Sequence, residues 1–290
     1  MVDSYAQFRN KGRSRHDERS VPVPFRSLLF PAALSLALVP VPALAGEGRD
    51  LCPDRPGLGT PACTVEAGGV ILEIGLGDWT RDSDAGQRSD TILTGDALLR
   101  IGLTSSLEAQ VGWTALAMVR ERDRASGAVS RMTQAGDVTL AVRQNLRSPD
   151  GSGFSLAVMP YASLPVGGRA IGAGDWGAGL LVPFSIEAGV LSIGLTPHVG
   201  AAVDGDGDGR HLAYGSVAGI GFGVTDALSV AAELSLTRDR DPAGALTEAL
   251  AGVSAGWQAD ADSQWDIGAN IGLNRDSPDV QLYFGFARRF

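Results

Sequence analysis

Hydrophobic and polar residues alternate through the last segment of the chain. Val280, Leu282, Phe284 and Phe286 occupy every second position, smaller or polar residues fill the gaps, and the final residue is Phe290. Successive side chains of a β-strand point to opposite faces, so this period of two predicts a strand with one apolar and one polar face. We therefore expect the two faces to meet different surroundings.

The same alternation recurs in eleven earlier segments. They are residues 65–79, 91–103, 107–120, 137–146, 154–164, 176–186, 190–203, 211–224, 228–237, 247–258 and 264–274. Their connections alternate between short turns, such as 104–106, and longer polar or Gly-rich loops, such as 121–135. Short periplasmic turns and long external loops are typical of bacterial outer-membrane barrels. We therefore predict an all-β fold, an antiparallel transmembrane β-barrel of about 12 strands in residues 64–290, with both chain ends in the periplasm.

The main alternative is a soluble β-sandwich, because its strands also alternate. A sandwich buries its apolar faces against each other, and its turns do not sort into long and short sets. The end of the chain also favours the barrel, because Leu282, Phe284, Phe286 and Phe290 resemble the assembly signal of bacterial outer-membrane barrels. Arg288 stands where that signal usually carries an apolar residue. We expect it near the membrane edge, where an arginine costs about 0–1 kcal/mol.

The start of the chain predicts export. Residues 1–45 combine a basic region with an apolar run, and they end in a small-x-small cleavage pattern at 43–45, as a secretory signal peptide does. Residues 46–63 are expected to form a stiff periplasmic knob ahead of the first strand. Cys52 and Cys63 lie in this segment, and an oxidising periplasm favours a disulfide between them. Two thiols without a nearby histidine supply too few ligands for a metal.

The charge of residues 46–290 argues against one class of partner. This part of the chain has 18 Arg, no Lys, and 30 Asp and Glu residues, a formal net charge of −12. An acidic chain without basic clusters is a poor nucleic-acid binder. It also has no apolar run of 18 or more residues, so no transmembrane helix is predicted. If it enters a membrane, a closed barrel is the form that satisfies its backbone hydrogen bonds.

Strand parity identifies candidate lumen-lining residues. They are Glu73, Asp96, Arg100, Glu108, Asp137, Arg143, His198, Glu233, Glu248 and Asp266. Charged residues that face a barrel interior either line water or pair with one another. Two interpretations therefore stay open: a salt-bridged lumen that rigidifies a nearly closed barrel, and a narrow aqueous path for neutral or cationic solutes. The same parity places Trp79 inward, and Leu93 and Val119 on the lipid face.

Two short motifs carry weak signals for ligands. Residues 172–177 match the dinucleotide fingerprint as a string, but that fingerprint needs a strand before it and a helix after it. Here the string ends a predicted loop and opens a strand, so we predict no cofactor. Residues 204–209 resemble the first half of an EF-hand loop, without the glutamate at position twelve or flanking helices. We expect a solvated hairpin tip there, with weak Ca²⁺ or lipopolysaccharide-bridging binding as the alternative.

His198 and His211 are predicted to project inward from adjacent strands. Two imidazoles could share a metal, but a third ligand is not evident, so we expect lining residues and no metal site. One sequence gives no evidence for a Ser-His-Asp arrangement, since spatial proximity is unknown. We therefore expect no enzyme activity, and a barrel lipid hydrolase that uses these histidines is the least favoured alternative.

Three stretches resemble a known family. They are residues 55–63 ahead of a Gly-rich strand, the hairpin at 102–108, and residues 136–143 followed by 154–167. Together with the terminal strand they resemble the outer-membrane transporters grouped as phenol-degradation MetA-pathway-like, over most of residues 52–290. The resemblance implies passage of small molecules, aromatic or hydrophobic compounds included, across the outer membrane. It assigns no binding site.

The resulting hypothesis is a channel of the bacterial outer membrane that passes small molecules by facilitated diffusion. Its expected partners are outer-membrane lipid and lipopolysaccharide, the barrel-assembly machinery and a small-molecule solute, with no nucleic acid. A non-conducting structural or partner-binding barrel is the first alternative, and it predicts a plugged lumen.

Overall fold

The computed structural model describes residues 48–168 and 171–290. The predicted signal peptide, residues 1–45, lies outside the described residues. The described residues form fourteen strands: β1 (Val70–Ser83), β2 (Gln87–Gly102), β3 (Leu107–Asp123), β4 (Val129–Gln134), β5 (Val138–Arg147), β6 (Phe154–Leu164), β7 (Gly177–Leu181), β8 (Phe184–Ala188), β9 (Leu191–Val203), β10 (Arg210–Gly223), β11 (Leu228–Asp239), β12 (Leu246–Asp260), β13 (Ser263–Gly272) and β14 (Val280–Arg289). Within the same ranges there is no helix long and apolar enough to cross a membrane.

The strands close into one antiparallel barrel. Each wall strand pairs with its neighbours, and the pairs β14–β1 and β9–β10 complete the ring. β7 and β8 both lie between β6 and β9, so they are two parts of one wall strand that is interrupted around Pro183. β4 and β5 pair with β3 in one continuous register and are likewise parts of one strand. The wall therefore has twelve strands, and the predicted fold is confirmed.

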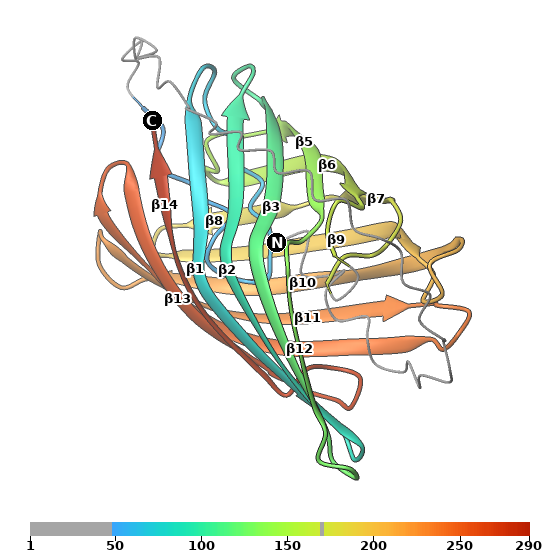
Figure 1. Cartoon of the computed structure of the whole chain (residues 1–290). Coiled ribbons are helices and arrows are strands. Elements are labelled where there is room, and N and C mark those ends of the chain that lie inside the picture. The colour runs from blue at the N-terminus through green and yellow to red at the C-terminus, as the bar shows by residue number, and fades with distance from the viewer. Residues whose placement is uncertain (1–47, 169–170) are drawn as a thin grey trace, which may run out of the picture.

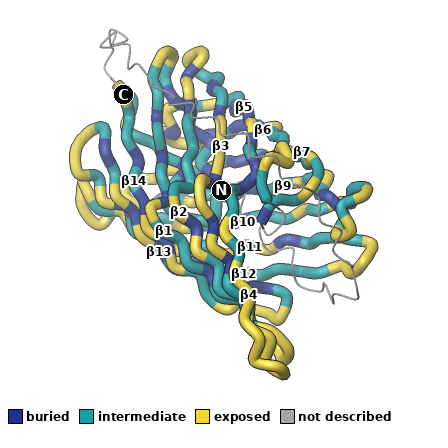
Figure 2. The backbone as a smooth tube through the Cα atoms, viewed as in Figure 1, coloured by how far each residue is buried: buried dark blue, intermediate teal, exposed yellow. Residues whose placement is uncertain are grey.

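The two sides of the barrel cross at a steep angle (Figure 1). Strands β1, β2, β3 and β14 run along one side, and β9 to β12 cross behind them. Tilted strands are a geometric requirement of barrel closure. The hairpins β1–β2 and β3–β4 extend well beyond the rest of the wall, and their tips are exposed (Figure 2). The connection predicted as a loop at 121–135 therefore contains a strand of its own, β4.

The wall is apolar outside and polar inside, the inverse of a soluble domain. In β3, for example, Val111 and Trp113 are exposed, whereas Glu108, Gln110 and Thr114 are buried. Buried and exposed positions alternate along many strands in Figure 2. The period of two in the sequence thus corresponds to the two faces of the wall, because side chains of a strand alternate between them.

Aromatic side chains lie on the outer face near both ends of the wall. Trp257 and Trp265 are paired across β12 and β13, and the Trp265 ring lies 4.7 Å from that of Phe286. At the opposite end, the Arg210 guanidinium lies 3.7 Å from the centre of the Trp176 ring. Aromatic girdles at two interfaces are typical of barrels that span a bilayer.

The terminal strand β14 turns its apolar residues outward. The residues of the predicted assembly signal are Leu282, Phe284, Phe286 and Phe290. Three of them are exposed, and Phe286 is half-buried against Trp265. Arg288 donates to Asp260 at 3.3 Å at the end of the wall that carries the short turns. This position agrees with an arginine outside the apolar band.

Strand parity fails in the middle of β1. This strand carries one extra residue, Leu76, opposite β14, and such a bulge reverses the faces of the residues that follow. Trp79, predicted inward, therefore faces outward beside Ile92 and Leu282, which are 40% and 47% exposed. The prediction for Trp79 was wrong because a simple alternation does not reveal a bulge.

The predictions that Leu93 and Val119 face lipid were also wrong. Both side chains are buried in a cluster with Ile171 from the long connection between β6 and β7. Gly95 has a φ of 70°, a left-handed conformation that favours glycine. This irregularity allows β2 to turn both Leu93 and Asp96, three residues apart, toward the inside.

Replacement of Gly95 tests the role of this irregularity. A Cβ at residue 95 would lie 3.2 Å from the Ala115 Cβ, and a left-handed residue other than glycine costs about 1–2 kcal/mol. We expect Gly95→Ala to lower the free energy of unfolding in detergent by about that amount, measured by urea titration of tryptophan fluorescence. Gly223→Ala, where no left-handed φ is required, is the matched control and should change stability by less. Equal effects of the two substitutions would contradict this account.

Candidate functional site

The N-terminal segment fills the lumen. Residues 52–65, here called the plug, lie between the two sides of the barrel, and none of the residues from 51 to 66 is exposed (Figures 1 and 2). Arg49, just before the plug, donates to Ser105 O in the short turn after β2 at 2.7 Å. The plug therefore enters from the end of the barrel that carries the short turns.

This placement differs from the knob outside the barrel that we predicted for residues 46–63. The physical reason is the charge of the inner wall, which offers carboxylates and guanidinium groups that need partners. The plug supplies them through its backbone and through Asp54 and Arg55. A segment that stood outside would leave buried charges of the wall without these partners.

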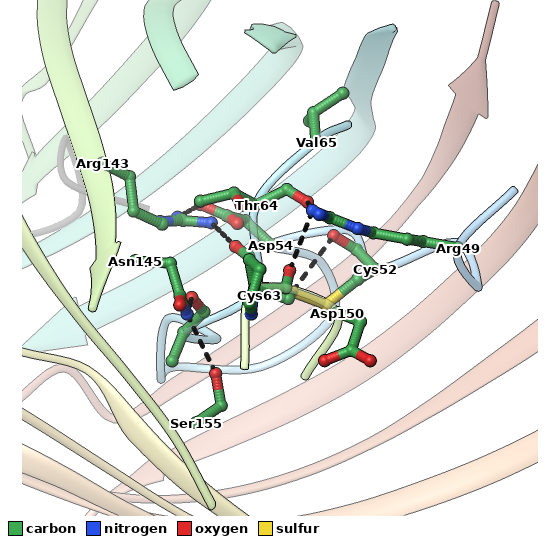
Figure 3. Close-up of a disulfide and its surroundings, with 12 residues drawn as sticks. Arg49, Cys52, Asp54, Cys63, Thr64, Val65, Arg143, Asn145, Asp150 and Ser155 are labelled. Carbon is green, nitrogen blue, oxygen red and sulfur yellow. Dashed lines mark hydrogen bonds and ion pairs between the residues drawn. A yellow bond between two sulfur atoms is a disulfide. The ribbon is translucent and has the colours of Figure 1, made fainter. Parts of the chain in front are cut away.

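The plug is closed into a loop by a disulfide between Cys52 and Cys63. The predicted bond is thus confirmed. Arg100 Nη1 donates to Cys52 O at 2.7 Å, and Arg143 Nη1 donates to Cys63 O at 3.0 Å. Figure 3 shows Arg143 and Asn145 reaching from β5 toward this loop, and Asn145 donates to Ala62 O at 2.8 Å. The base of the loop is thereby fixed to the wall.

A fully buried ion-pair network joins the plug to β1, β2, β3 and β5. Arg100 lies 3.0 Å from Asp54, 3.2 Å from Glu73 and 3.0 Å from Glu108. Arg143 lies 2.6 Å from Asp54 and 3.3 Å from Glu108. Every side chain in the network is at most 3% exposed. Asp54 is the only plug residue among the five, and it contacts both arginines.

The electrostatics of Asp54 follow from this environment. Burial disfavours its charged form, but the guanidinium groups of Arg100 and Arg143 outweigh that penalty and hold the pKa of Asp54 below its ordinary value. Asp54 and Arg55 also donate their backbone N–H groups to the two oxygens of Glu73, each at 2.9 Å. The start of the loop is therefore held by both its side chains and its backbone.

A second set of contacts reaches the opposite side of the barrel. Glu233 on β11 accepts the backbone N–H groups of Leu58 at 2.6 Å and Gly59 at 2.9 Å. Thr196 on β9 exchanges two hydrogen bonds of 3.1 Å with the backbone of Thr60. The plug is thus bonded to strands on both sides of the lumen, and it bridges them.

Two further contacts anchor Arg55 and Gly57. Arg55 forms an ion pair of 2.9 Å with Asp266 on β13, whose side chain is fully buried. Gly57 donates its N–H to the hydroxyl of Tyr283 on β14 at 3.1 Å. These bonds attach the plug to β13 and β14 as well.

The structure places all ten predicted lumen-lining residues on the inner side of the wall or at its rim. Six of them bond the plug: Glu73, Arg100, Glu108, Arg143, Glu233 and Asp266. Asp137 instead accepts the N–H groups of Gly167 and Ala173, both at 2.8 Å, and so holds the connection between β6 and β7. The remaining three residues lie at other positions of the inner wall.

These three residues are Asp96, Glu248 and His198. Asp96 accepts a hydrogen bond of 2.8 Å from Thr114 and, with Glu248, lines a cavity beside the plug. His198 Nε2 lies 3.4 Å from the hydroxyl of Thr237. His211 lies four positions along β10 from the residue that pairs with His198, about 13 Å away at the spacing of a strand. The two histidines therefore do not form one site.

The cavity beside the plug has a volume of about 80 Å³ and is here called the vestibule. Its wall includes Asp78, Asp96, Asn270, Gln281 and Tyr283, and residues 54–58 of the plug form another side. A water occupies about 30 Å³ in the liquid, and an apolar cavity that binds benzene measures about 150 Å³. The vestibule therefore has room for a few waters and is smaller than a cavity that binds benzene.

Sequence reasoning missed several residues that make this site. Asp54 and Arg55 were assigned to a segment outside the barrel, and Asp78 was hidden by the bulge at Leu76. A signal for the plug was present in the excess of inward carboxylates, which require hydrogen-bond donors when they are buried. Strand alternation gives no information on where those donors originate.

Comparisons with known proteins identify a family for the chain. A family model described as "Putative MetA-pathway of phenol degradation" matches residues 53–290. The NanC porin is 10% identical, with 76% of this chain and 98% of that chain covered and a TM-score of 0.48. The translocator domain of the autotransporter NalP from Neisseria meningitidis is 13% identical, with 77% of this chain and 89% of that chain covered and a TM-score of 0.46. The KdgM porin is 9% identical, with 74% of this chain and 98% of that chain covered and a TM-score of 0.44. A search of curated proteins found no match.

Substitution of Asp54 tests the attachment of the plug. Removal of one partner from a buried ion-pair network costs about 3–5 kcal/mol, because the remaining charges lose their balance. We expect Asp54→Asn to raise the rate at which proteinase K cleaves residues 52–65 by roughly a hundredfold or more, since cleavage follows the population of the released plug. Mass spectrometry of the folded protein in detergent measures the cleavage. Asp50→Asn, an exposed acid four residues earlier, should leave the rate unchanged, and equal rates for both variants would contradict the assignment.

Proposed function

The chain belongs to the phenol-degradation MetA-pathway family, and we propose that it forms a plugged channel of the bacterial outer membrane. The channel passes small molecules, aromatic compounds among them, down their concentration gradient. The observation that carries this proposal is the closed wall of twelve strands, apolar outside and polar inside, around a lumen that one short segment fills. The aromatic cargo rests on the description of the family.

The outer face supports the membrane location. A closed barrel satisfies all its backbone hydrogen bonds within the wall, as a spanning segment must in lipid. The exposed apolar band lies between Trp257 and Trp265 at one end and Trp176 at the other, which suits two lipid interfaces. Outer-membrane lipid and lipopolysaccharide are the proposed surroundings, and the outward residues of β14 are the proposed signal to the barrel-assembly machinery.

Passage requires movement of the plug. The vestibule is smaller than an aromatic ring needs, and the plug bonds both sides of the lumen beside it. The disulfide makes residues 52–63 one compact loop, so the loop moves as a unit. A shift of this loop would open a path lined by Asp96, Glu233 and Glu248. Such a lining is acidic and favours neutral or cationic solutes over anions.

A non-conducting barrel is the second candidate function, and the plug is the observation that favours it. A permanently plugged barrel would serve the envelope or bind partners through its long hairpins. The lipid-hydrolase alternative has less support, because His198 and His211 lie apart and bond different residues. We assign no catalytic role to either histidine in this function.

A disulfide between the plug and the wall, which can be formed and then reduced, distinguishes a channel from a sealed barrel. A Cβ at Gly59 would lie 3.6 Å from Thr196 Oγ1, so the pair Gly59→Cys and Thr196→Cys is placed to form a disulfide between plug and wall. We expect liposomes that contain the native protein to take up benzyltrimethylammonium, an aromatic cation that does not cross lipid unaided. Uptake should fall to the protein-free rate in the oxidised double variant and recover with reductant. Tracer influx measures the uptake.

The single variant Thr196→Cys and the native protein, each with and without reductant, are the controls. They separate the effect of the new bond from that of opening Cys52–Cys63. Uptake that persists in the oxidised double variant would show that passage does not need the plug to move. No uptake by the native protein under any condition would favour the non-conducting barrel and contradict the proposed channel.

A further inference from the structure

We propose that the outer face of the long hairpins β1–β2 and β3–β4 binds the phosphate groups of lipid A, the membrane anchor of lipopolysaccharide. Five arginines and one aspartate form this surface, here called the arginine face: Arg81, Arg88, Arg120, Arg122 and Arg131, with Asp90. The site rests on the proposed outer-membrane location, with the long hairpins outside the cell. It does not depend on whether the barrel conducts.

Strand pairing places these residues in two adjacent rows. The first row crosses four strands and consists of Arg81, Asp90, Arg120 and Arg131, each directly opposite the next. The second row, two residues farther out, pairs Arg88 with Arg122. Neighbouring strands lie about 4.8 Å apart and alternate residues about 7 Å apart, so the arginine face measures about 14 Å by 7 Å. Its formal net charge is +4, within a part of the chain that carries −12 overall.

The arginine face lies directly beyond the apolar band of the outer wall. Trp79 faces outward two residues before Arg81, and the Arg81 guanidinium lies 4.7 Å from the centre of the Trp79 ring. Met118 is exposed two residues before Arg120, whereas Val119 between them is buried. Alternate residues of a strand share a face, so the arginines continue the lipid-facing side. This places them at the level where the headgroups of the outer leaflet begin.

The arginines have few acidic partners on their own face. Arg88 stands directly opposite Arg122, and Arg120 directly opposite Arg131; like charges in such cross-strand pairs are destabilising. Asp90 is the one acid in the two rows. It lies 3.3 Å from Arg81, 2.8 Å from Arg88 and 3.8 Å from Arg120. One carboxylate thus serves three arginines, and a bound phosphate group would supply the negative charge that the face lacks.

The other acids of these hairpins are directed elsewhere. Asp84 and Asp123 accept backbone N–H groups within their own turns, each at 2.7 Å. Asp82 and Glu121 each follow an arginine of the first row directly in sequence, so they lie on the opposite face. Asp279 accepts a serine hydroxyl at the β1 edge. The positive charge of the arginine face therefore remains available to an anion from the membrane.

The arrangement suits a phosphate that belongs to a lipid. A guanidinium group donates two parallel N–H bonds to phosphate oxygens, which makes arginine well suited to phosphate recognition. Lipid A carries its phosphate groups on a sugar headgroup directly above its acyl chains. Acyl chains along Trp79 and Met118 would place those phosphates beside the arginines. An apolar surface directly below a cationic one favours such a lipid over free phosphate.

Native mass spectrometry of the full-length protein in detergent, titrated with lipid A, tests the proposal. We expect one bound lipid A per barrel and an affinity about thirtyfold lower in the double variant Arg122→Gln/Arg131→Gln. Each arginine near a lipid headgroup contributes about a factor of five. The double variant Arg122→Lys/Arg131→Lys keeps the charge and should recover most of the affinity. A chelator in the buffer excludes bridging of phosphate to Asp90 by divalent cations.

The double variant Arg124→Gln/Arg240→Gln is the matched control. It removes the same charge from the end with the long loops, outside the arginine face, and should leave the affinity within about twofold of the native value. Dephosphorylated lipid A should bind the native protein as weakly as lipid A binds Arg122→Gln/Arg131→Gln. Heat modifiability on gels checks that each variant is folded.

Equal affinities of the native protein and Arg122→Gln/Arg131→Gln, or an equal loss in the matched control, would overturn the site. Undiminished binding of dephosphorylated lipid A would also overturn it, because the acyl chains alone would then account for binding. Phosphate-dependent binding by a protein that shows no solute uptake would support the arginine face and contradict the proposed channel.

Discussion

Two buried arginines in the lumen impose the constraint on which this structure depends. Arg100 and Arg143 are fully buried, and a buried charge is tolerated only when it is paired and hydrogen-bonded. The wall provides Glu73 and Glu108, and the plug provides Asp54 and two backbone carbonyl groups. Neither the wall nor the plug satisfies these charges alone. The folded lumen and the docked plug are therefore one electrostatic unit.

The same constraint explains why polar residues concentrate inside. With the apolar side chains turned outward, each strand has only its inner face on which to place charged groups. A twelve-strand barrel is wider than an eight-strand barrel. The interior of an eight-strand barrel can be filled by side chains alone. The plug occupies the additional space, and its backbone N–H groups bond carboxylates of the wall such as Glu233. Closure of the lumen and satisfaction of its charges are thus achieved by one segment.

Much of this architecture can be predicted from local patterns. The period of two predicts the wall strands and the inner position of Glu73, Arg100 and Glu233, and two cysteines in an exported chain predict the disulfide. Parity fails wherever the backbone is irregular, as Trp79 and Leu93 demonstrate, because a single extra or left-handed residue reverses all faces beyond it.

The long-range part of the site could not be predicted. Asp54 meets Arg143 across 89 positions of the chain, and Leu58 meets Glu233 across 175. Alternation specifies which face a residue occupies, and it does not specify which distant segment fills the space opposite. The plug has no strand or helix pattern of its own, since its conformation follows from the partners that the wall presents.

Hydrogen exchange of the plug tests the central claim most directly. Residue-resolved exchange on the full-length protein in detergent, without solute, would follow the backbone N–H groups of Asp54, Arg55, Leu58 and Gly59. If buried charge holds the plug in the lumen, these four groups exchange as slowly as the wall strands do. Exchange at the rate of an unstructured peptide would contradict the account, because it would mean that the arginines of the lumen find their partners without the plug.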